Sequence, residues 1–226
     1  MSTVIASVDR RSPAQLAGIK PGEQLLTING HEIIDVLDYR FYGYDADSHL
    51  TLREPNGAQR AVHIRKQEGQ DLGLNFDTYL MDEMRSCANH CIFCFVDQMP
   101  PGMRQTLYFK DDDARLSFLL GNYITLTNLT EREAQRIIDL HICPINVSVH
   151  TTDPQLHCTM LGNKNAGRSL EYIRAFCKAG IVMNGQIVIC PGWNDGDQLR
   201  RTLRDLTDWE FSSCSLVPVG ITKYRK

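Results

Sequence analysis

The chain has 226 residues, of which 42% are hydrophobic and 23% are charged, and its formal net charge is −3. This composition is ordinary for a soluble globular protein, and the length suits one large domain or two small ones. The slightly acidic balance predicts no nucleic-acid partner, because binding to phosphates needs a basic surplus or patch. No apolar run is long enough to cross a bilayer, and the first residues lack the pattern of a signal peptide. We therefore expect a cytoplasmic protein whose eight cysteines are reduced thiols.

Residues 1–76 have the pattern of a small β-rich module. Short apolar stretches predict strands over residues 4–8, 24–28, 50–52 and 62–64. Helix caps and tight turns are predicted at Ser12-Pro13, Gly18, Asn29-Gly30 and Asp35. The second helix is expected to run from Asp35 to about residue 42.

From residue 77 onward, predicted strands alternate with predicted helices. Strands are expected over residues 80–84, 122–127, 145–149, 181–189 and 213–219. Helices are expected after the capping box Thr130–Glu133, over residues 169–179 and over residues 197–208. This alternation predicts an α/β fold with a parallel sheet covered by helices. The run Lys110-Asp111-Asp112-Asp113 is interpreted as a solvated loop or a helix start rather than as a metal site.

Three cysteines stand close together between the first two of these strands. Cys87, Cys91 and Cys94 have the spacing C-x-x-x-C-x-x-C, and Phe93 precedes the third. Such thiolates can hold three irons of a [4Fe–4S] cluster, and one iron would stay open because no fourth cysteine follows at ligand spacing. A structural zinc site with His90 or a distant cysteine as fourth ligand is an alternative, as are three unconnected thiols. The spacing favours the iron–sulfur interpretation.

The cysteine spacing and the aromatic residue resemble the signature of the radical S-adenosylmethionine (SAM) superfamily, in which the open iron chelates the amino and carboxylate groups of SAM. Further motifs sharpen the resemblance: residues 95–100, 107–113, 121–129 and 217–225. Together they are similar to an uncharacterised bacterial family of iron–sulfur oxidoreductases related to metallocofactor maturases. Its members join a PDZ module, a radical SAM barrel and a C-terminal domain of unknown function.

This resemblance implies an incomplete radical SAM (β/α) partial TIM barrel over residues 77–226. Barrel active sites lie at the carboxyl ends of the strands, so the segments that follow the strands should border the cysteine loop. The residues expected to contact SAM there are Phe93, Asn128, Ser148, His150 and Asn194. Residues 126–129 stand where the superfamily usually has a glycine-glycine-glutamate run, so the contact to the SAM amino group must differ. Because the strand pattern stops after residue 219, we expect a C-terminally truncated, poorly soluble member.

The run from Ser12 to Glu23, followed by Asn29-Gly30, resembles a bacterial PDZ domain. The resemblance implies that a peptide adds as a strand in a groove between residues 4–8 and 35–42. The residues expected to line this groove are Val4, Ile5, Ala6 and Tyr39. The family's carboxylate-binding loop has no clear counterpart before residue 4, so we expect no preference for free C-termini. A docking module without a free peptide ligand is the alternative.

The resemblance as a whole implies an enzyme that uses an electron donor to cleave SAM at the cluster and then abstracts hydrogen from a substrate. The substrate is unknown, and a protein or peptide docked by the PDZ-like module is one candidate. The alternative is a non-catalytic iron–sulfur or zinc-binding scaffold or sensor that carries a peptide-binding module.

Overall fold

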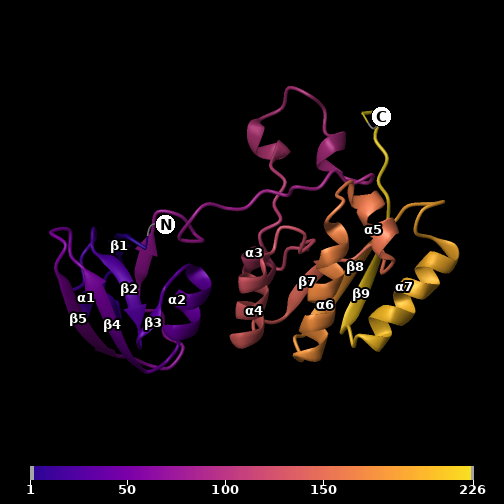
Figure 1. Ribbon diagram of the computed structural model, residues 1–226. Helices are drawn as coiled ribbons and strands as arrows, with labels where there is room; N and C mark the ends of the chain where they lie inside the picture. The colour runs from indigo at the N-terminus through magenta and orange to yellow at the C-terminus, as the bar shows by residue number, and fades with distance from the viewer. Residues whose placement is uncertain (1–2, 225–226) are drawn as a thin grey trace. The chain divides into compact units, whose positions relative to one another are not determined.

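The computed structural model describes residues 3–224 and divides the chain into two compact units, Met1–Met84 and Arg85–Lys226 (Figure 1). The first unit therefore continues beyond residue 76, where we predicted the end of the β-rich module. No helix in the described range is both long enough and apolar enough to cross a membrane.

The N-terminal unit consists of two antiparallel sheets and two short helices. One sheet pairs β1 (Ile5–Val8) with β6 (Leu74–Phe76). The other has the order β3-β2-β4-β5, formed by His31–Glu32, Gln24–Ile28, Asp47–Arg53 and Gln59–Arg65. The helices are α1 (Pro13–Leu16) and α2 (Val36–Tyr42). The mixed fold with a β-rich N-terminal region agrees with the sequence prediction.

The predicted caps and turns explain where these elements begin and end. The Ser12 hydroxyl accepts a hydrogen bond from the Gln15 backbone N–H at the start of α1, and Asp35 caps α2 through the Leu37 N–H. Asn29 and Gly30 both have positive φ, 51° and 83°, as a two-residue hairpin turn between β2 and β3 requires. All of these signals were predicted and are confirmed.

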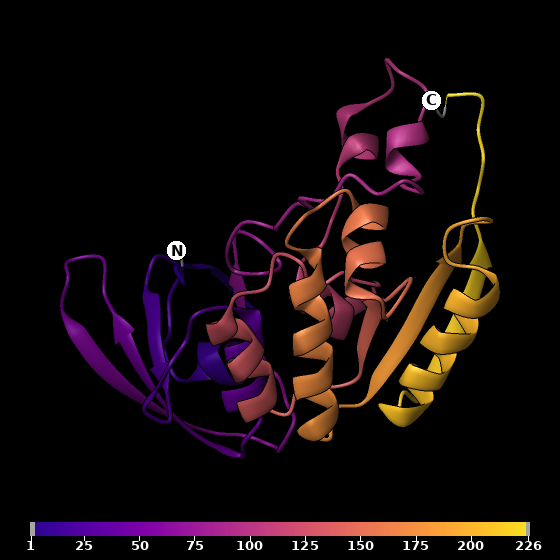
Figure 2. The same cartoon turned by 45° about the vertical axis from the view of Figure 1, so that its right-hand side comes forward.

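The C-terminal unit is built on a parallel sheet. Its strands β7 (Ile145–Ser148), β8 (Met183–Ile189) and β9 (Ser213–Pro218) lie in that order, and an isolated parallel bridge joins Ile124 to Val147 beside β7. Helices α4 (Glu131–Asp139), α6 (Ser169–Lys178) and α7 (Gly196–Asp208) lie along one face of the sheet in both views (Figures 1 and 2). Each helix turns apolar side chains inward, as Ile137, Phe176 and Leu206 show by their burial.

The remaining helices of this unit are short. They are α3 (Ala114–Leu120), α5 (Pro154–Leu161) and the 3₁₀ turns η1 (Val96–Gln98), η2 (Gln105–Tyr108) and η3 (Ala166–Arg168). Asp113 is the N-cap of α3, so the helix-start interpretation of the acidic run is confirmed. Its interpretation as solvated is wrong for Asp112 and Asp113, which are 2% and 1% exposed.

Two predicted strands are wrong. Residues 80–84 form a turn and bends. Leu80 and Met81 are buried, which explains the apolar pattern, but Met81 takes a positive φ of 67° that an extended strand does not allow. Residues 122–127 make only the bridge at Ile124. There the Thr125 backbone N–H donates to the Asp112 carboxylate at 2.6 Å. This N–H is therefore bonded to a side chain and not to the backbone of a neighbouring strand.

Two glycines that follow helices differ in what surrounds them. Gly162 after α5 and Gly180 after α6 both have positive φ, 58° and 72°. A Cβ at Gly162 would lie 2.5 Å from the carbonyl oxygen of His90 in the cysteine loop, whereas a Cβ at Gly180 would meet nothing within 4 Å. Gly162 therefore permits both a left-handed helix end and a close approach of two backbones.

We predict that Gly162→Ala destabilises the C-terminal unit more than Gly180→Ala does. Gly180→Ala should cost about 1–2 kcal/mol, the strain of an L-residue in the left-handed region. Gly162→Ala should add the displacement of the His90 backbone, and chemical denaturation followed by circular dichroism measures the difference. Equal losses in the two variants would contradict the close approach.

Candidate functional site

The loop that carries Cys87, Cys91 and Cys94 lies at the carboxyl-terminal end of the parallel sheet (Figure 1). Residues 91–93 pack against a buried cluster of Met160, Leu161, Ala166 and Cys190, which Val188 and Val219 also contact. The His90 N–H donates to the Leu161 carbonyl and the Ile92 N–H to the Met160 carbonyl, both at 2.9 Å. The loop is therefore held on the end of α5 and on the residues that follow β8 and β9.

The buried side chain of Asn89 holds the cysteine loop in place by hydrogen bonds to neighbouring segments. Its side chain is 2% exposed, and its Nδ2 donates to the hydroxyls of Thr125 at 3.0 Å and Thr127 at 2.8 Å. Its Oδ1 accepts from Asn163 Nδ2 at 2.8 Å. One amide thus connects the cysteine loop to two other segments of the unit, and every buried polar atom in this network has a partner.

Two further segments hold the loop at its ends. The Cys87 N–H donates to the Lys110 carbonyl at 2.6 Å, next to an antiparallel bridge between Ser86 and Asp111. Beyond Cys94, the Gln98 side chain donates to the Cys94 carbonyl at 3.2 Å and accepts the Thr222 N–H at 3.2 Å. The cysteine-bearing backbone is therefore tied down on both sides of the three thiols.

The other two thiols act electrostatically on Cys91. Burial raises the pKa of Cys91 to about 12, and the neighbouring Cys87 and Cys94 add to the rise. Burial also raises the pKa of Cys87, with the Asp112 carboxyl as the next cause. Lys110 acts in the opposite direction on both thiols and forms an ion pair with Asp97 at 2.6 Å. A cationic metal group would remove the protons from these thiols and relieve the crowding.

The spacing of the sulfur atoms bears on which metal group fits. In the described part of the chain, Asp47, His49 and His63 form the only group of three or more such side chains with ligand atoms within 4.8 Å of one another. At least one pair of the three cysteine sulfur atoms therefore lies farther apart than 4.8 Å. A single tetrahedral zinc with Zn–S bonds of about 2.3 Å holds its sulfurs roughly 3.8 Å apart, so the loop fits a larger group better. The thiol donor set is the one that iron–sulfur clusters use.

Phe93 and His150 meet at the inner wall of the site. Their ring centroids lie 4.2 Å apart at an angle of 49°. The Val188 N–H donates to Nδ1 of His150 at 3.2 Å, so the proton of the neutral ring is on Nε2. Burial lowers the pKa of His150 to about 3, and the nearby His157 contributes. His150 is therefore an uncharged residue that supports Phe93.

The other residues expected to contact SAM differ in how many of their side-chain polar atoms already have a hydrogen-bond partner within the protein. The fully buried Asn194 donates from Nδ2 to the carbonyls of His150 at 2.8 Å and Val188 at 2.9 Å, and its Oδ1 accepts the Cys190 N–H at 2.8 Å. Its amide is saturated by backbone groups, which gives it a structural role. Ser148 is half-buried at the end of β7, and within residues 3–224 its hydroxyl makes no hydrogen bond to protein. Asn128 makes one long contact, 3.5 Å from Nδ2 to the Ser86 carbonyl.

Residues 127–128, 150–153 and 190–195 were expected to border the cysteine loop, and Asn89, Phe93 and the buried cluster confirm that they do. Sequence reasoning missed Asn89, Gln98 and Gly162. Their types are common in loops, and no spacing rule marks them. A glycine directly after a helix is a recognisable cap signal, but not a signal of close backbone approach.

The N-terminal unit contains a second candidate site, beside β6. Both sides of β1 are occupied: it pairs with β6 on one side, and on the other Ile5 exchanges hydrogen bonds with Glu23 and Gly22. Addition of a peptide at Val4, Ile5 and Ala6 would require one of these pairings to open, which leaves β6 as the other strand of this sheet to consider. This strand has β1 as its only strand partner in the described structure, and Tyr39 of α2 packs edge-on against Phe76 at 5.5 Å.

Asp71 lies shortly before β6 and is hydrogen-bonded to Gly73 and Tyr39. The Gly73 N–H donates to the Asp71 carboxylate at 2.6 Å, and the Tyr39 hydroxyl donates to the same oxygen at 3.1 Å. The Leu74 N–H donates to the Tyr39 hydroxyl at 3.3 Å. Of these residues, Tyr39 and Asp71 border a pocket of about 250 Å³. The two amides that could receive a peptide carboxylate already have partners, and one of these is an anion.

The stability of the C-terminal unit should decrease with falling pH because of its buried imidazoles. Burial lowers the pKa of His150 to about 3 and that of His157 to about 4, whereas unfolded imidazoles titrate near about 6.5. Between these values the unfolded chain binds protons that the folded unit excludes. Each imidazole should then lower the free energy of unfolding by up to about 1.4 kcal/mol per pH unit of acidification.

The measurement is a comparison of wild type with His157→Gln by denaturation between pH 7 and about 5.5, above the range in which most carboxyls titrate. Asp112, whose pKa burial raises to about 6, acts in the opposite sense in both proteins and cancels in the difference. The variant should show a shallower slope by about one proton. Equal slopes would mean that His157 is protonated in the folded protein.

Two family models match this chain. Residues 66–215 match a model described as a radical SAM-like domain, and residues 4–53 match a model described as a PDZ domain. None of the curated proteins compared with the chain matches it. The first match covers more than half of the 226 residues and includes the cysteine loop together with β7 and β8. The chain therefore belongs to the radical SAM-like family, with a PDZ domain preceding the cysteine loop.

Proposed function

We propose that the C-terminal unit is an iron–sulfur enzyme in which Cys87, Cys91 and Cys94 hold a [4Fe–4S] cluster that binds SAM. The observation that carries the proposal is the arrangement of the three thiols. They share one loop, which packs against a buried cluster, and they lie at the carboxyl ends of parallel strands. Cys87 and Cys94 are also close enough to Cys91 to contribute to its raised pKa. When bound, the cluster and SAM supply reductive cleavage of SAM and abstraction of a substrate hydrogen, and this chemistry belongs to the cofactors.

The residues of the chain would bind and orient these groups. Three thiolates leave one iron without a protein ligand, which is where the resemblance to the superfamily implies that SAM binds. Lys110 is the cation near the thiols and would offset part of the negative charge of three thiolates. The Ser148 hydroxyl and the Asn128 amide are the polar groups best able to contact SAM, whereas His150 and Asn194 hold the wall behind it.

Several broader features belong to the same proposal. Residues 77–226 would form part of a (β/α) barrel, since helices line one face of a parallel sheet and the candidate site lies at the carboxyl ends of its strands. An external electron donor is required, and a cytoplasmic location suits an oxygen-sensitive cluster. The resemblance to bacterial iron–sulfur oxidoreductases supports this proposal. A non-catalytic scaffold or sensor is the alternative, and it predicts that the reconstituted protein does not cleave SAM.

The cluster is tested by anaerobic reconstitution with iron and sulfide. Wild type should take up about four irons per chain. Cys91→Ala should lose the cluster, because Cys91 is the middle ligand and two thiolates cannot hold the cube. Cys177→Ala is the matched control, since Cys177 is also half-buried but lies on α6.

Addition of SAM and dithionite then separates the enzyme from the scaffold. Methionine should form with wild type and with Cys177→Ala, but not with Cys91→Ala. Full iron content in Cys91→Ala would overturn the ligand assignment. A complete cluster without SAM cleavage would favour the scaffold.

A second function is favoured by the free edge of β6. We propose that the N-terminal unit docks an extended segment of a protein partner or substrate on β6, alongside α2. Strand addition uses backbone hydrogen bonds, so it accepts internal segments as well as chain ends. Asp71 makes the end of the groove unfavourable for a second carboxylate.

We predict that the wild-type protein binds peptides with free and amidated C-termini equally well. In Asp71→Asn the preference for free C-termini should rise by about fivefold, the factor that corresponds to ~1 kcal/mol between unit charges 4 Å apart in water. Fluorescence anisotropy with paired peptide libraries measures the ratio. Asp77→Asn removes the same charge from a residue outside the pocket and should change nothing. Wild-type binding that disappears on amidation would contradict the prediction.

A further inference from the structure

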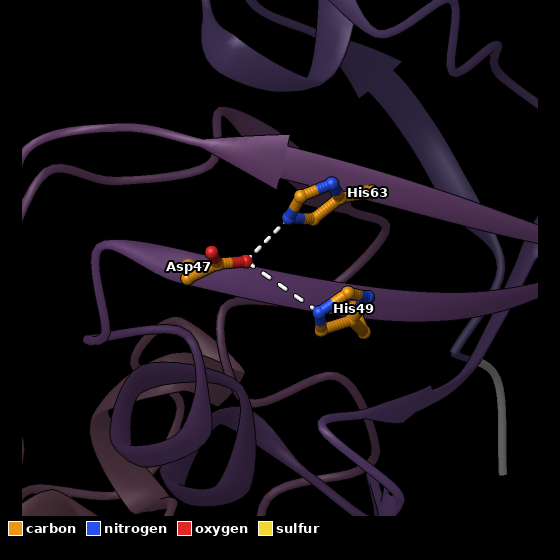
Figure 3. A group of neighbouring side chains, drawn as sticks. All are labelled: Asp47, His49 and His63. Atoms are coloured by element: carbon orange, nitrogen blue, oxygen red, sulfur yellow. Dashed lines mark hydrogen bonds and ion pairs between the residues drawn. The ribbon is translucent and has the colours of Figure 1, made fainter.

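Two histidines and an aspartate form a cluster on the outer face of the four-stranded sheet, and none of the three belongs to either candidate site (Figure 3). His49 on β4 and His63 on β5 are directly paired across the strands. Asp47 lies two residues before His49 and therefore on the same face. The residues between them in sequence, such as Ser48 and Leu50, are buried on the opposite face. Strand alternation and register thus bring the three side chains together.

The ligand atoms of the cluster lie close to one another. Nε2 of His49 lies 3.5 Å from Oδ1 of Asp47, and Nε2 of His63 forms a close hydrogen bond with the same oxygen. All three ligand atoms lie within 4.8 Å of one another. The imidazole rings are stacked, with centroids 4.3 Å apart and planes within 2° of parallel.

We propose that Asp47, His49 and His63 bind a divalent transition-metal ion that favours imidazole ligands, such as Ni²⁺, Zn²⁺ or Cu²⁺. Two imidazoles and one carboxylate suit these ions, whereas Ca²⁺ and Mg²⁺ need oxygen-rich sites. The remaining coordination positions face solvent and would be filled by water.

The geometry allows the ligands to close around an ion. Parallel rings cannot both point their nitrogen lone pairs at one metal, so each ring must rotate about its Cβ–Cγ bond. The side chains of His49 and His63 are 69% and 41% exposed, which leaves room for that rotation. The ion would replace the proton that His63 now shares with Asp47, and its charge would pair with the carboxylate.

The neighbouring charges are compatible with a bound cation. Arg65 is the nearest cationic side chain, and its Nε lies 3.8 Å from Oδ2 of Asp47, the oxygen that does not face the imidazoles. Asp45 lies close by, joined to Asn29 at 3.4 Å, and contributes a second negative charge. A bound ion would link β4 to β5 through side chains and stabilise the folded N-terminal unit.

Nickel titration of the full-length protein tests the site. Because thiols also bind nickel, the location is read by NMR: paramagnetic Ni²⁺ should broaden amide signals of residues 47–51 and 61–65 of ¹⁵N-labelled protein. Calorimetry gives the affinity. His49→Ala and His63→Ala should each weaken binding at this site by at least about tenfold, no less than the loss of an outer-sphere partner costs a metal site.

His31→Ala is the matched control, since His31 is exposed in the same unit but lies outside the cluster, stacked on Tyr42. It should leave the nickel affinity unchanged. Circular dichroism verifies that each variant is folded. Broadening confined to the cysteine loop, or broadening of residues 47–51 that survives in both His49→Ala and His63→Ala, would overturn the proposal.

Discussion

The buried amide of Asn89 is the interaction on which the candidate site depends. A loop of three cysteines has no regular backbone pairing of its own, and its position must come from side chains and from neighbouring backbone. Asn89 supplies both donors and the acceptor of one side chain to Thr125, Thr127 and Asn163. A buried network whose groups are all satisfied specifies one geometry. Any other position of the loop would leave several of these polar groups unpaired, and each unpaired buried group costs free energy. The loop can therefore hold a fixed shape before any metal group binds.

The same segment explains why one predicted strand does not form. Thr125 uses its backbone N–H and its hydroxyl on the Asp112 carboxylate, and Leu126 takes a positive φ of 61°. The β-branched residues favour a strand by propensity, but a buried carboxylate competes for the backbone and the predicted strand does not form. The polar side chains are thereby turned toward the cysteine loop. A regular strand would leave Thr125 and Thr127 on one face, but it would not allow the turn that brings them to Asn89.

Sequence reasoning succeeded where a local signal determines the outcome. The capping box at Thr130, the Asn29-Gly30 turn and strands β7, β8 and β9 follow from residue type and periodicity over a few positions. It failed for residues 80–84, where buried Leu80 and Met81 gave an apolar pattern without an extended backbone. It could find the three cysteines from their spacing, but not which polar residues remain available. Asn194 and Ser148 both follow strands, and only the tertiary structure shows that one amide is saturated while one hydroxyl has no protein partner.

The N-terminal unit shows the same limit at the level of topology. The apolar pattern of residues 4–8 identified a strand correctly, but not whether that strand is an edge. Whether β1 is an edge strand depends on β6. This strand lies 66 residues or more further along the chain and pairs with the side of β1 that would otherwise be free. Once β6 covers β1, the strand whose backbone can still accept a partner is β6, next to α2 and Tyr39. The position of Asp71 then follows directly, because it shortly precedes β6 and accepts the N–H of Gly73, the residue before that strand. The free edge of β6 and the carboxylate beside it are thus one consequence of where the last strand of the unit pairs.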